Sequence, residues 1–382
     1  MTSSAQPTET NSFPDLIELD ALRMTVIVDN EVDHMSSAPK EIGQTSSAMR
    51  LYKDRRNLDK EKSTVSSAEP SGHVHGHDQG HDSQTEKGTG TKDGVEHRVL
   101  FDTGPQSAIF LENAKRLEIE FEKIEVIVLS HWHIDHSGGM MAAVDRCREA
   151  RRQGEDLPPV IADLHPDRPD QRGACLSKPS SSGEGPDILD YVAWGRDPSF
   201  QGLKEAGVEV SLNDKAHTIC DGFFGISGTI PRNTSYETGI PNHVRWSEKN
   251  KSWGSEPHIM DERYLVARVK SKGIVVLTGC SHAGVINVCQ DVERAFQGCD
   301  KSNDGKSNAD IFFVVGGFHL AGASVETRIK DTVQDMKKIN PSFMAPGHCS
   351  GWRAKSALEQ AMPGKVISLG VGSDFLIAKQ ES

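Results

Sequence analysis

Hydrophobic positions in the first half of the chain fall into short apolar runs, rich in β-branched residues, that alternate with segments of helical spacing. Apolar runs of about four to eight residues bounded by turn residues are typical of buried strands. A glycine turn follows the second run, and a Gly-Gly pair opens the second helix. The predicted strands cover residues 22–29, 98–104, 125–130 and 159–163, and the predicted helices cover residues 108–117 and 140–151. This order predicts an α/β architecture.

The pattern is harder to interpret over residues 165–257, which are rich in Pro, Gly and Ser, and becomes regular again afterwards. The strand candidates of this half are residues 208–212, 223–227, 264–269, 273–278, 311–315, 342–345 and 366–369. The third and fourth of them are close enough to form a β-hairpin. Apolar positions three and four residues apart predict amphipathic helices over residues 285–296 and 325–336.

Polar segments lie on both sides of the first strand. Residues 1–21 predict a polar tail, and residues 22–382 predict a single domain. An insertion at about residues 34–95 has too few large apolar side chains to offset the entropy of ordering, so we expect it to be disordered. Four of its histidines, His73, His75, His77 and His81, lie in one short tract. This tract could bind zinc, nickel or copper weakly, or it could be a solvated linker.

The composition narrows the class of protein. The chain of 382 residues is 36% hydrophobic and 26% charged, which is ordinary for a globular protein. It lacks the roughly 18 apolar residues of a membrane span and the pattern of a signal peptide, so we expect a cytoplasmic protein without a membrane partner. Its seven unevenly spaced cysteines indicate reduced thiols. The net charge of −12 disfavours nucleic acid as a partner.

Metal-binding side chains are concentrated in one run. The predicted strand over residues 125–130 leads directly into His131-Trp-His-Ile-Asp-His136. In an extended backbone, imidazoles two residues apart project to the same side. Zinc-type ions bind His nitrogens and carboxylate oxygens at about 2.0–2.2 Å, so this density of ligands suits a two-metal site. The run also leaves the carboxyl end of a buried strand, which is where open α/β sheets place their sites.

Short motifs along the chain resemble those of a known superfamily. Phe101-Asp-Thr-Gly104 and Leu129-Ser-His-Trp-His-Ile-Asp-His-Ser-Gly-Gly139 are similar to the first two motifs of the metallo-β-lactamase superfamily. Three later segments resemble the branch that includes 7,8-dihydropterin-6-methyl-4-(β-D-ribofuranosyl)aminobenzene-5′-phosphate synthase. They are Leu277-Thr-Gly-Cys-Ser-His-Ala-Gly284, Gly316-Gly-Phe-His-Leu320 and Pro346-Gly-His-Cys-Ser-Gly351.

The resemblance implies a fold and a set of ligands. The fold is an αβ/βα sandwich, in which two mixed β-sheets are flanked by helices and a metal site lies along one edge. By position, His131 and His133 would bind one metal, while Asp135 and His136 would bind a second. Asp102 would lie beneath these ligands and orient one of them. Alternatively, Asp102 only forms the turn before Thr-Gly.

The later motifs depart from the commonest pattern of the superfamily. Cys280 occupies the position of the usual bridging aspartate, where it could bind metal as a thiolate or could be a buried small residue. The usual third-motif histidine is absent near residues 228–231, and His282 could supply the missing ligand. His348 matches the last ligand of the superfamily by its order among the strands.

Further side chains are candidates for contact with a substrate. His319 ends the strand before that of His348 and could transfer a proton or contact the substrate, or it could be structural. Asp135 and His319 are therefore the candidate catalytic residues. Arg232 lies in a segment that resembles a substrate-side motif, and it could bind phosphate or be solvated. We expect His165 and His243 at the surface.

These residues predict an enzyme with two divalent metal ions. Zinc is the first expectation, with manganese, iron and magnesium as alternatives. The resemblance implies a transferase that acts on a small, phosphorylated, pterin-like molecule. The alternatives are a metallo-hydrolase of a phosphoester, thioester or lactone, and a metal-binding protein without catalysis, because one architecture can host many chemistries.

Overall fold

Two β-sheets lie face to face, and side chains that alternate along their strands fill the core between them. The computed structural model describes residues 11–30, 41, 43–46, 85–152, 157–178, 188–297 and 310–379. In strand β16 (Gly273–Thr278), Val275 and Leu277 belong to the core between the sheets, whereas Ile274 and Val276 belong to the core beneath the outer helices. The strand is apolar throughout because both of its faces are buried.

Among the described residues, the first sheet has seven strands. They are β1 (Glu18–Leu19), β11 (His217–Ile219), β12 (Phe224–Ile226), β15 (Tyr264–Val269), β16, β17 (Ile311–Gly317) and β18 (Phe343–Gly347). Their order is β11-β12-β15-β16-β17-β18, with β1 paired to β15. The hairpin of β15 and β16 is antiparallel, while β16, β17 and β18 run parallel to one another. These three parallel strands therefore end at the same edge.

The second sheet has eight strands in the part of the chain that the structure describes. They are β2 (Ala21–Val28), β3 (Gly43–Ser46), β4 (Thr85–Lys92), β5 (Val95–Phe101), β6 (Val126–Val128), β7 (Ile161–Leu164), β10 (Glu209–Leu212) and β19 (Ser373–Ala378). Their order is β10-β7-β6-β5-β4-β2-β19-β3. Strands β5, β6, β7 and β10 are parallel, and the remaining pairs are antiparallel. Both sheets are therefore mixed.

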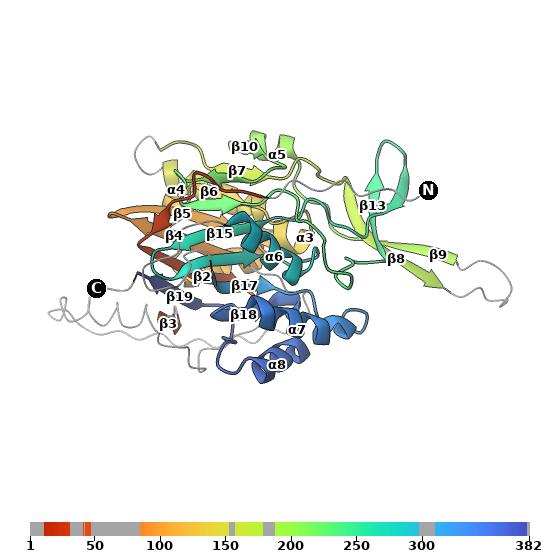
Figure 1. The fold of residues 1–382 in the computed structure, drawn as a ribbon. Coiled ribbons are helices and arrows are strands. Elements are labelled where there is room, and N and C mark those ends of the chain that lie inside the picture. The colour runs from red at the N-terminus through yellow and green to blue at the C-terminus, as the bar shows by residue number, and fades with distance from the viewer. Residues whose placement is uncertain are drawn as a thin grey trace, which may run out of the picture.

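Helices cover the outer faces of both sheets (Figure 1). The α-helices are α2 (Ser107–Arg116), α3 (Ile134–Ser137), α4 (Met140–Arg152), α5 (Phe200–Glu205), α6 (Val285–Ala295), α7 (Ile329–Ile339) and α8 (Trp352–Ala361). Short 3-10 turns are η1 (Phe121–Lys123), η2 (Glu326–Arg328) and η3 (His348–Ser350). Apolar residues of α2, α4 and α5 share a core with the second sheet, and those of α6, α7 and α8 share one with the first. The predicted αβ/βα sandwich of two mixed sheets is confirmed.

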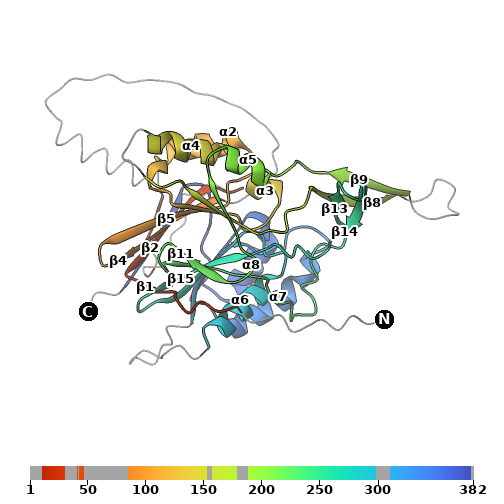
Figure 2. The ribbon, with the colours of Figure 1, turned by 90° about the horizontal axis from the view of Figure 1, so that it is seen from above.

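A small third sheet projects from the sandwich beside α3 (Figures 1 and 2). Its strands are β8 (Gln171–Lys178), β9 (Ile188–Ala193), β13 (His243–Ser247) and β14 (Ser252–Ser255). They pair in the order β14-β13-β8-β9, and all of the pairs are antiparallel. These four strands lie in the middle of the chain, and none of them is among the strand candidates that the hydrophobic pattern gave.

The described ends of the chain differ from the sequence prediction. The structure orders the predicted N-terminal tail from Asn11 onward, because Phe13 and Leu16 are buried and β1 pairs with β15. The predicted strand over residues 366–369 makes only one bridge, between Val366 and Met344. Ile367 is nevertheless buried in the core between the sheets. The last strand is β19, which lies between β2 and β3.

The predicted insertion at about residues 34–95 also contains regular structure. Strands β3 and β4 lie within it, and β4 pairs with β2 and β5 along its whole length. The tract with His73, His75, His77 and His81 lies outside the described residues. Within the described ranges, no helix has both the length and the apolar character to cross a membrane.

Strand β4 has few apolar residues because its glycines make room for the opposite sheet. Gly88 and Gly90 are two residues apart and share one face of the strand. A methyl group added to Gly90 would lie 3.0 Å from Leu19 Cδ1, 3.0 Å from Phe223 Cδ1 and 3.3 Å from Phe224 Cζ. The aromatic rings of the first sheet therefore occupy the space that β-branched side chains fill in other strands.

We predict that Gly90→Val destabilises the fold by about 1–3 kcal/mol, because the new side chain overpacks the core against Leu19 and Phe223. The matched control is Thr91→Val on the other face of β4, a position that is partly exposed. Denaturant unfolding of both variants and the wild type measures the difference. Equal stability of Gly90→Val and Thr91→Val would contradict this account of the strand.

Candidate metal centre

The candidate ligands converge where strands of both sheets end. His131 and His133 lie in the loop after β6, and α3 follows at once with Asp135 and His136. Cys280 and His282 follow β16, and His348 follows β18. Because β16 and β18 are parallel and lie on either side of β17, their carboxyl ends are close together. Side chains from three segments distant in sequence therefore meet at one edge of the sandwich.

The first group consists of His131, His133 and His282, all buried. His131 Nε2 lies 2.9 Å from His133 Nδ1, and His282 Nε2 lies 3.2 Å from each of these two atoms. Two ligands bound at about 2.0–2.1 Å in a tetrahedral arrangement lie roughly 3.3–3.4 Å apart. The three nitrogens therefore have nearly the spacing of ligands around one ion.

Hydrogen-bond partners fix the tautomers of His131 and His133. Ser130 donates its hydroxyl proton to Asp102, so Ser130 Oγ must accept from His131 Nδ1 at 2.9 Å. His243 donates from Nδ1 to the carbonyl of Glu256, so its Nε2 accepts from His133 Nε2 at 3.0 Å. The lone pairs of His131 Nε2 and His133 Nδ1 consequently face each other across 2.9 Å.

A cation satisfies the facing nitrogens of His131, His133 and His282 better than a proton does. A proton on His282 Nε2 could be donated to one of the two facing lone pairs but not to both. Burial, followed by neighbouring imidazoles, lowers the pKa of His131 and His282 well below the usual range, so these rings are neutral near pH 7. A divalent ion accepts all three nitrogens at once. The residues present thus fit a metal ion of the zinc type.

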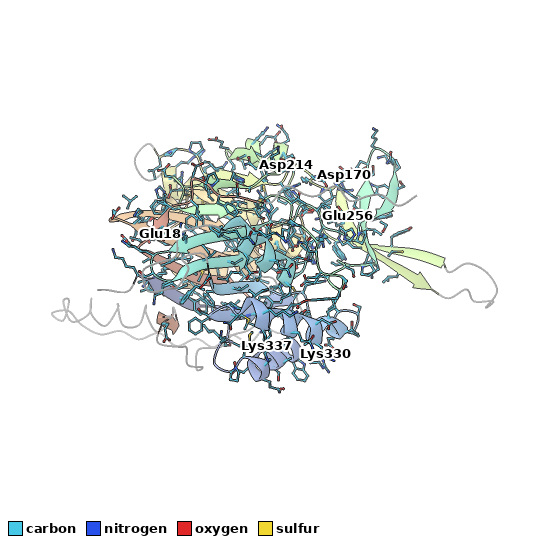
Figure 3. All side chains as sticks on the ribbon, viewed as in Figure 1. Glu18, Asp170, Asp214, Glu256, Lys330 and Lys337 are labelled. Carbon is cyan, nitrogen blue, oxygen red and sulfur yellow. The ribbon has the colours of Figure 1, made fainter. Side chains whose placement is uncertain are left out.

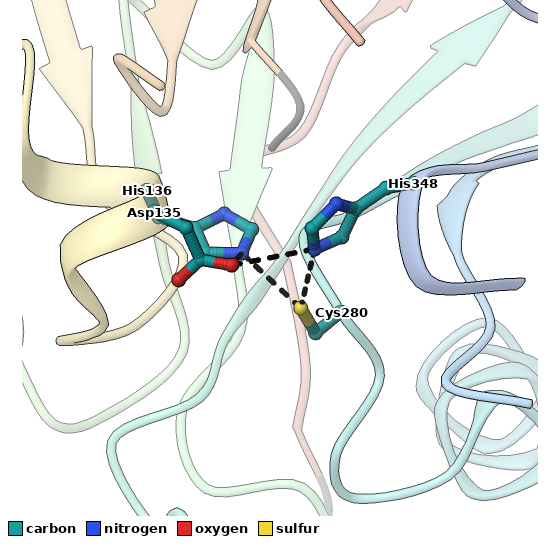
Figure 4. A group of neighbouring side chains, drawn as sticks. All are labelled: Asp135, His136, Cys280 and His348. Carbon is teal, nitrogen blue, oxygen red and sulfur yellow. Dashed lines mark hydrogen bonds and ion pairs between the residues drawn. The ribbon is translucent and has the colours of Figure 1, made fainter. Parts of the chain in front are cut away.

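The second group consists of Asp135, His136, Cys280 and His348, shown in Figure 4. Cys280 Sγ lies 3.1 Å from His136 Nε2 and 3.0 Å from His348 Nε2. Asp135 Oδ2 lies 3.7 Å from His136 Nε2 and 3.6 Å from His348 Nε2. The Cys280 thiol can donate its proton to only one of the two imidazoles, whereas a cation could bind the sulfur, both ring nitrogens and the carboxylate, so this group also suits a cation.

The two groups are neighbours. The rings of His131 and His136, one from each group, have centroids 4.3 Å apart. Asp135 is the most accessible ligand candidate of the second group, with 27% of its side chain exposed, whereas His136 is fully buried. Two ions bound by these neighbouring groups could share one substrate. Asp135 lies on the side from which solvent enters.

Asp102 lies beneath both groups, where the resemblance placed it. Its carboxylate accepts from His136 Nδ1 at 2.7 Å, from Ser130 N at 2.7 Å and from Ser130 Oγ at 2.8 Å. The residue has a φ of 61°, a left-handed conformation that Asp tolerates better than most residues do. Asp102 fixes His136 directly and His131 through Ser130, so one carboxylate orients a candidate ligand in each group.

Buried charges set the protonation of the second group. Burial lowers the pKa of His136, but Asp135 and Asp102 outweigh it, so the net shift is upward. Burial likewise opposes the positive charge of His348, yet Cys349 and Asp135 raise its pKa to about 9. Burial raises the pKa of the Cys280 thiol well above its usual range. A bound metal would reverse this last shift, because metal ions stabilise thiolates.

His243 is the functional residue that sequence reasoning missed. We expected His243 and His165 at the surface, but both are buried. His243 begins β13 of the projecting sheet and contacts His133, and Trp194 packs against both rings at centroid distances of 5.3 and 5.2 Å. No local sequence signal marks His243, because its role arises only when the projecting sheet docks against the site.

A buried ion network anchors the projecting sheet to the site. Arg172 of β8 binds Asp261 and Glu256, with Nε 2.9 Å from Glu256 Oε2. Asp261 also accepts from the backbone N of Trp132 at 2.7 Å. Glu256, labelled in Figure 3, lies where this sheet joins the sandwich and offers its carbonyl to His243. The network therefore fixes both the loop between His131 and His133 and the partner of His133.

The two candidate substrate contacts lie next to the first group. The ring of His319 packs edge-on against His282, with centroids 4.5 Å apart, and has a φ of 48°. Arg232 donates from Nη1 to the carbonyl of His282 at 3.1 Å. Glu262 accepts from the backbone N of His282 at 2.7 Å. Arg232 thus supports the His282 loop; the residue as a whole is partly buried, and its Nε finds no hydrogen-bond partner within the described ranges of the chain.

We predict that His243→Ala weakens metal binding at the first group by roughly 10–100-fold, because His133 loses the acceptor that fixes its tautomer. Competition with a chromophoric chelator measures the affinity. His243→Gln retains an acceptor and should recover most of the loss. A His243→Ala protein with wild-type affinity would show that His243 does not position His133.

Comparison with known proteins gives consistent similarities. A family model described as a beta-lactamase superfamily domain matches residues 97–201. An uncharacterized protein of Methanocaldococcus jannaschii is 30% identical over 266 residues, which covers 69% of this chain and 83% of the relative. From the same organism, 7,8-dihydropterin-6-methyl-4-(β-D-ribofuranosyl)-aminobenzene-5′-phosphate synthase is 26% identical over 294 residues, 72% of this chain and 85% of the relative.

A solved structure shares the fold over nearly the whole chain. It is described as a metal-dependent hydrolase of the beta-lactamase superfamily and superposes with a TM-score of 0.56 at 20% identity. The superposition covers 92% of this chain and 98% of that structure. At this identity the likeness concerns the fold alone.

Proposed function

The chain belongs to the metallo-β-lactamase superfamily, and on that premise we propose that it is a metal-dependent transferase acting on a small, phosphorylated, pterin-like molecule. The observation that carries the enzymatic part is the pair of adjacent side-chain groups, within each of which the potential ligand atoms lie within 4.8 Å of one another. The synthase relative supports the choice of reaction.

The proposed centre holds two divalent ions. His131, His133 and His282 are the proposed ligands of one ion, and Asp135, His136, Cys280 and His348 are those of the other. Imidazole and thiolate donors favour zinc over magnesium, while manganese and iron are further options. When bound, such ions supply Lewis-acid stabilisation of negative charge on phosphoryl oxygens.

The side chains of the chain itself supply positioning and proton transfer in this proposal. An arylamine partner forms the new bond to the pterin methyl carbon as diphosphate leaves, and the partner must lose one proton. His319 is the proposed acceptor of that proton, because its ring lies against His282 at the edge of the centre. The partly exposed carboxylate of Asp135 is the proposed contact on the substrate side of the centre.

Arg232 is the proposed contact for the phosphorylated end of the substrate. Its Nη1 is occupied by the carbonyl of His282, so the remaining donors of the guanidinium are the ones offered to an anion. Burial is the largest influence on the pKa of Arg232 and lowers it, while the negative charges of Glu262 and Glu237 act in the opposite direction. A phosphate bound there would be a second partner of the Arg232 guanidinium, besides the carbonyl of His282, and would neutralise a charge that is partly removed from solvent.

Parallel assays test the reaction. The metal-loaded protein is offered a dihydropterin diphosphate with its arylamine partner, a bis-aryl phosphate and a thioester. We expect diphosphate release that requires both the pterin and the amine. Release without the amine, or cleavage of the other substrates, would instead favour a hydrolase. Inactivity of fully loaded protein would favour a metal-binding protein without catalysis.

We predict that His133→Ala removes about one of the two metal ions, because only two imidazoles of the first group are left. Elemental analysis after dialysis measures the metal content. The control is His217→Ala, a partly buried histidine that binds Asp163 instead of either group. Wild-type occupancy in His133→Ala would refute the assignment of the first group, whatever reaction the protein performs.

A further inference from the structure

A separate cluster of metal-binding side chains lies away from the proposed centre. It comprises His97 of β5, Glu125 just before β6, and Cys220 and Asp221 in the turn between β11 and β12. His97 precedes Asp102 by five positions along an extended strand, which is about 16 Å at roughly 3.3 Å per residue. None of these residues belongs to either group of the centre. The cluster joins an end of the second sheet to a turn of the first.

Glu125 orients the imidazole of His97. His97 Nδ1 lies 2.8 Å from Glu125 Oε2, and the other carboxylate oxygen accepts from the backbone N of Arg98 at 3.1 Å. Because a carboxylate only accepts, Nδ1 carries the proton, and in the neutral ring the lone pair is on Nε2. Nε2 lies 3.7 Å from Asp221 Oδ2. This is the geometry of a carboxylate–histidine pair that presents a nitrogen to a metal.

Cys220 completes the set of donors. One potential ligand atom from each of His97, Glu125 and Cys220 lies within 4.8 Å of the others. His97 is well covered, with 14% of its side chain exposed, and Cys220 is partly buried. The neighbours that face the thiol, Glu125 and Asp221, are both acidic. Together with burial, which is the largest influence, they raise the pKa of Cys220.

The turn holds these side chains in an unfavourable backbone conformation. Cys220 and Asp221 have φ values of 51° and 52°, and Gly222 continues the left-handed run at 84°. Non-glycine residues rarely adopt this region, because their Cβ comes too close to the backbone. The ring of Phe223 packs against His97 with centroids 4.4 Å apart, which keeps the turn on β5. Tertiary packing therefore maintains a turn that the sequence alone disfavours.

We propose that this cluster is a structural binding site for a zinc-type divalent cation. His97 Nε2, Cys220 Sγ and the Asp221 carboxylate are the ligands, and Glu125 orients His97. Ligands at about 2.0–2.3 Å from zinc are separated by roughly 3.3–3.8 Å, so the 3.7 Å between His97 and Asp221 already suits one ion. The cation offsets the negative charge of the carboxylates and thiolate. It also fastens the β11–β12 turn to β5.

The first test counts metal in the full-length protein. Wild type, Cys220→Ser, His97→Gln and the control Cys175→Ser are loaded with zinc, then dialysed against a weak chelator. Cys175 is likewise partly buried but has no part in the cluster. We expect Cys220→Ser and His97→Gln each to lose about one zinc ion per chain, while Cys175→Ser loses none. Equal zinc in all four proteins, or zinc that dialysis removes from all alike, means an adventitious ion only and overturns the proposal.

The second test identifies the thiolate by its spectrum. Cobalt is loaded into Cys280→Ser, which removes the thiol of the proposed centre. A thiolate-to-cobalt charge-transfer band should persist and disappear on adding Cys220→Ser, but not on adding Cys175→Ser. A band that survives in Cys280→Ser/Cys220→Ser overturns the assignment of Cys220. Circular dichroism of the metal-free variants confirms that they fold. This readout does not depend on the proposed transferase activity.

Discussion

The candidate metal centre depends on a hydrogen-bond constraint: the imidazoles of His131, His133 and His136 each use one ring nitrogen on a buried partner, which leaves the other nitrogen for the centre. For His136 the partner is Asp102, for His131 it is Ser130, and for His133 it is His243. Leaving a buried donor unsatisfied costs about 1–3 kcal/mol, which is enough to hold each tautomer. The facing lone pairs are therefore a consequence of the surrounding structure and exist before any metal binds.

This constraint requires a rigid frame, which the two sheets and two buried arginines supply. Arg263 donates to Asp163 Oδ1 at 2.6 Å and to the carbonyl of Leu129 at 2.9 Å, which ties β6 and β7 to the first sheet. Arg172 makes the equivalent connection between the projecting sheet and Asp261. Removing one partner of a buried ion pair is strongly destabilising, so such networks fix the arrangement once it forms.

Cys280 adds a thiol donor to the candidate ligands of the centre. Cys280 lies between His136 and His348, at the position that resembles that of the usual bridging aspartate. Its sulfur can take the place of that carboxylate oxygen. A soft thiolate donor beside imidazoles favours zinc-type ions and disfavours magnesium. Among the residues that the structure describes, Asp135 is the one carboxylate in the two groups, and it is the ligand candidate of the second group with the most exposed side chain.

The sequence by itself determined the elements whose pattern is local: the apolar strands, the β15–β16 hairpin, the amphipathic helices and the dense run from His131 to His136. The order of the motifs also indicated Cys280, His282 and His348 as candidate ligands. It did not reveal β4, whose glycines match aromatic rings from the other sheet, or the projecting sheet that contains His243. Which nitrogens face one another, and which histidines form a group, was decided only by the tertiary structure. The reason is physical: a side chain's hydrogen-bond partner and packing neighbour can lie more than a hundred residues away.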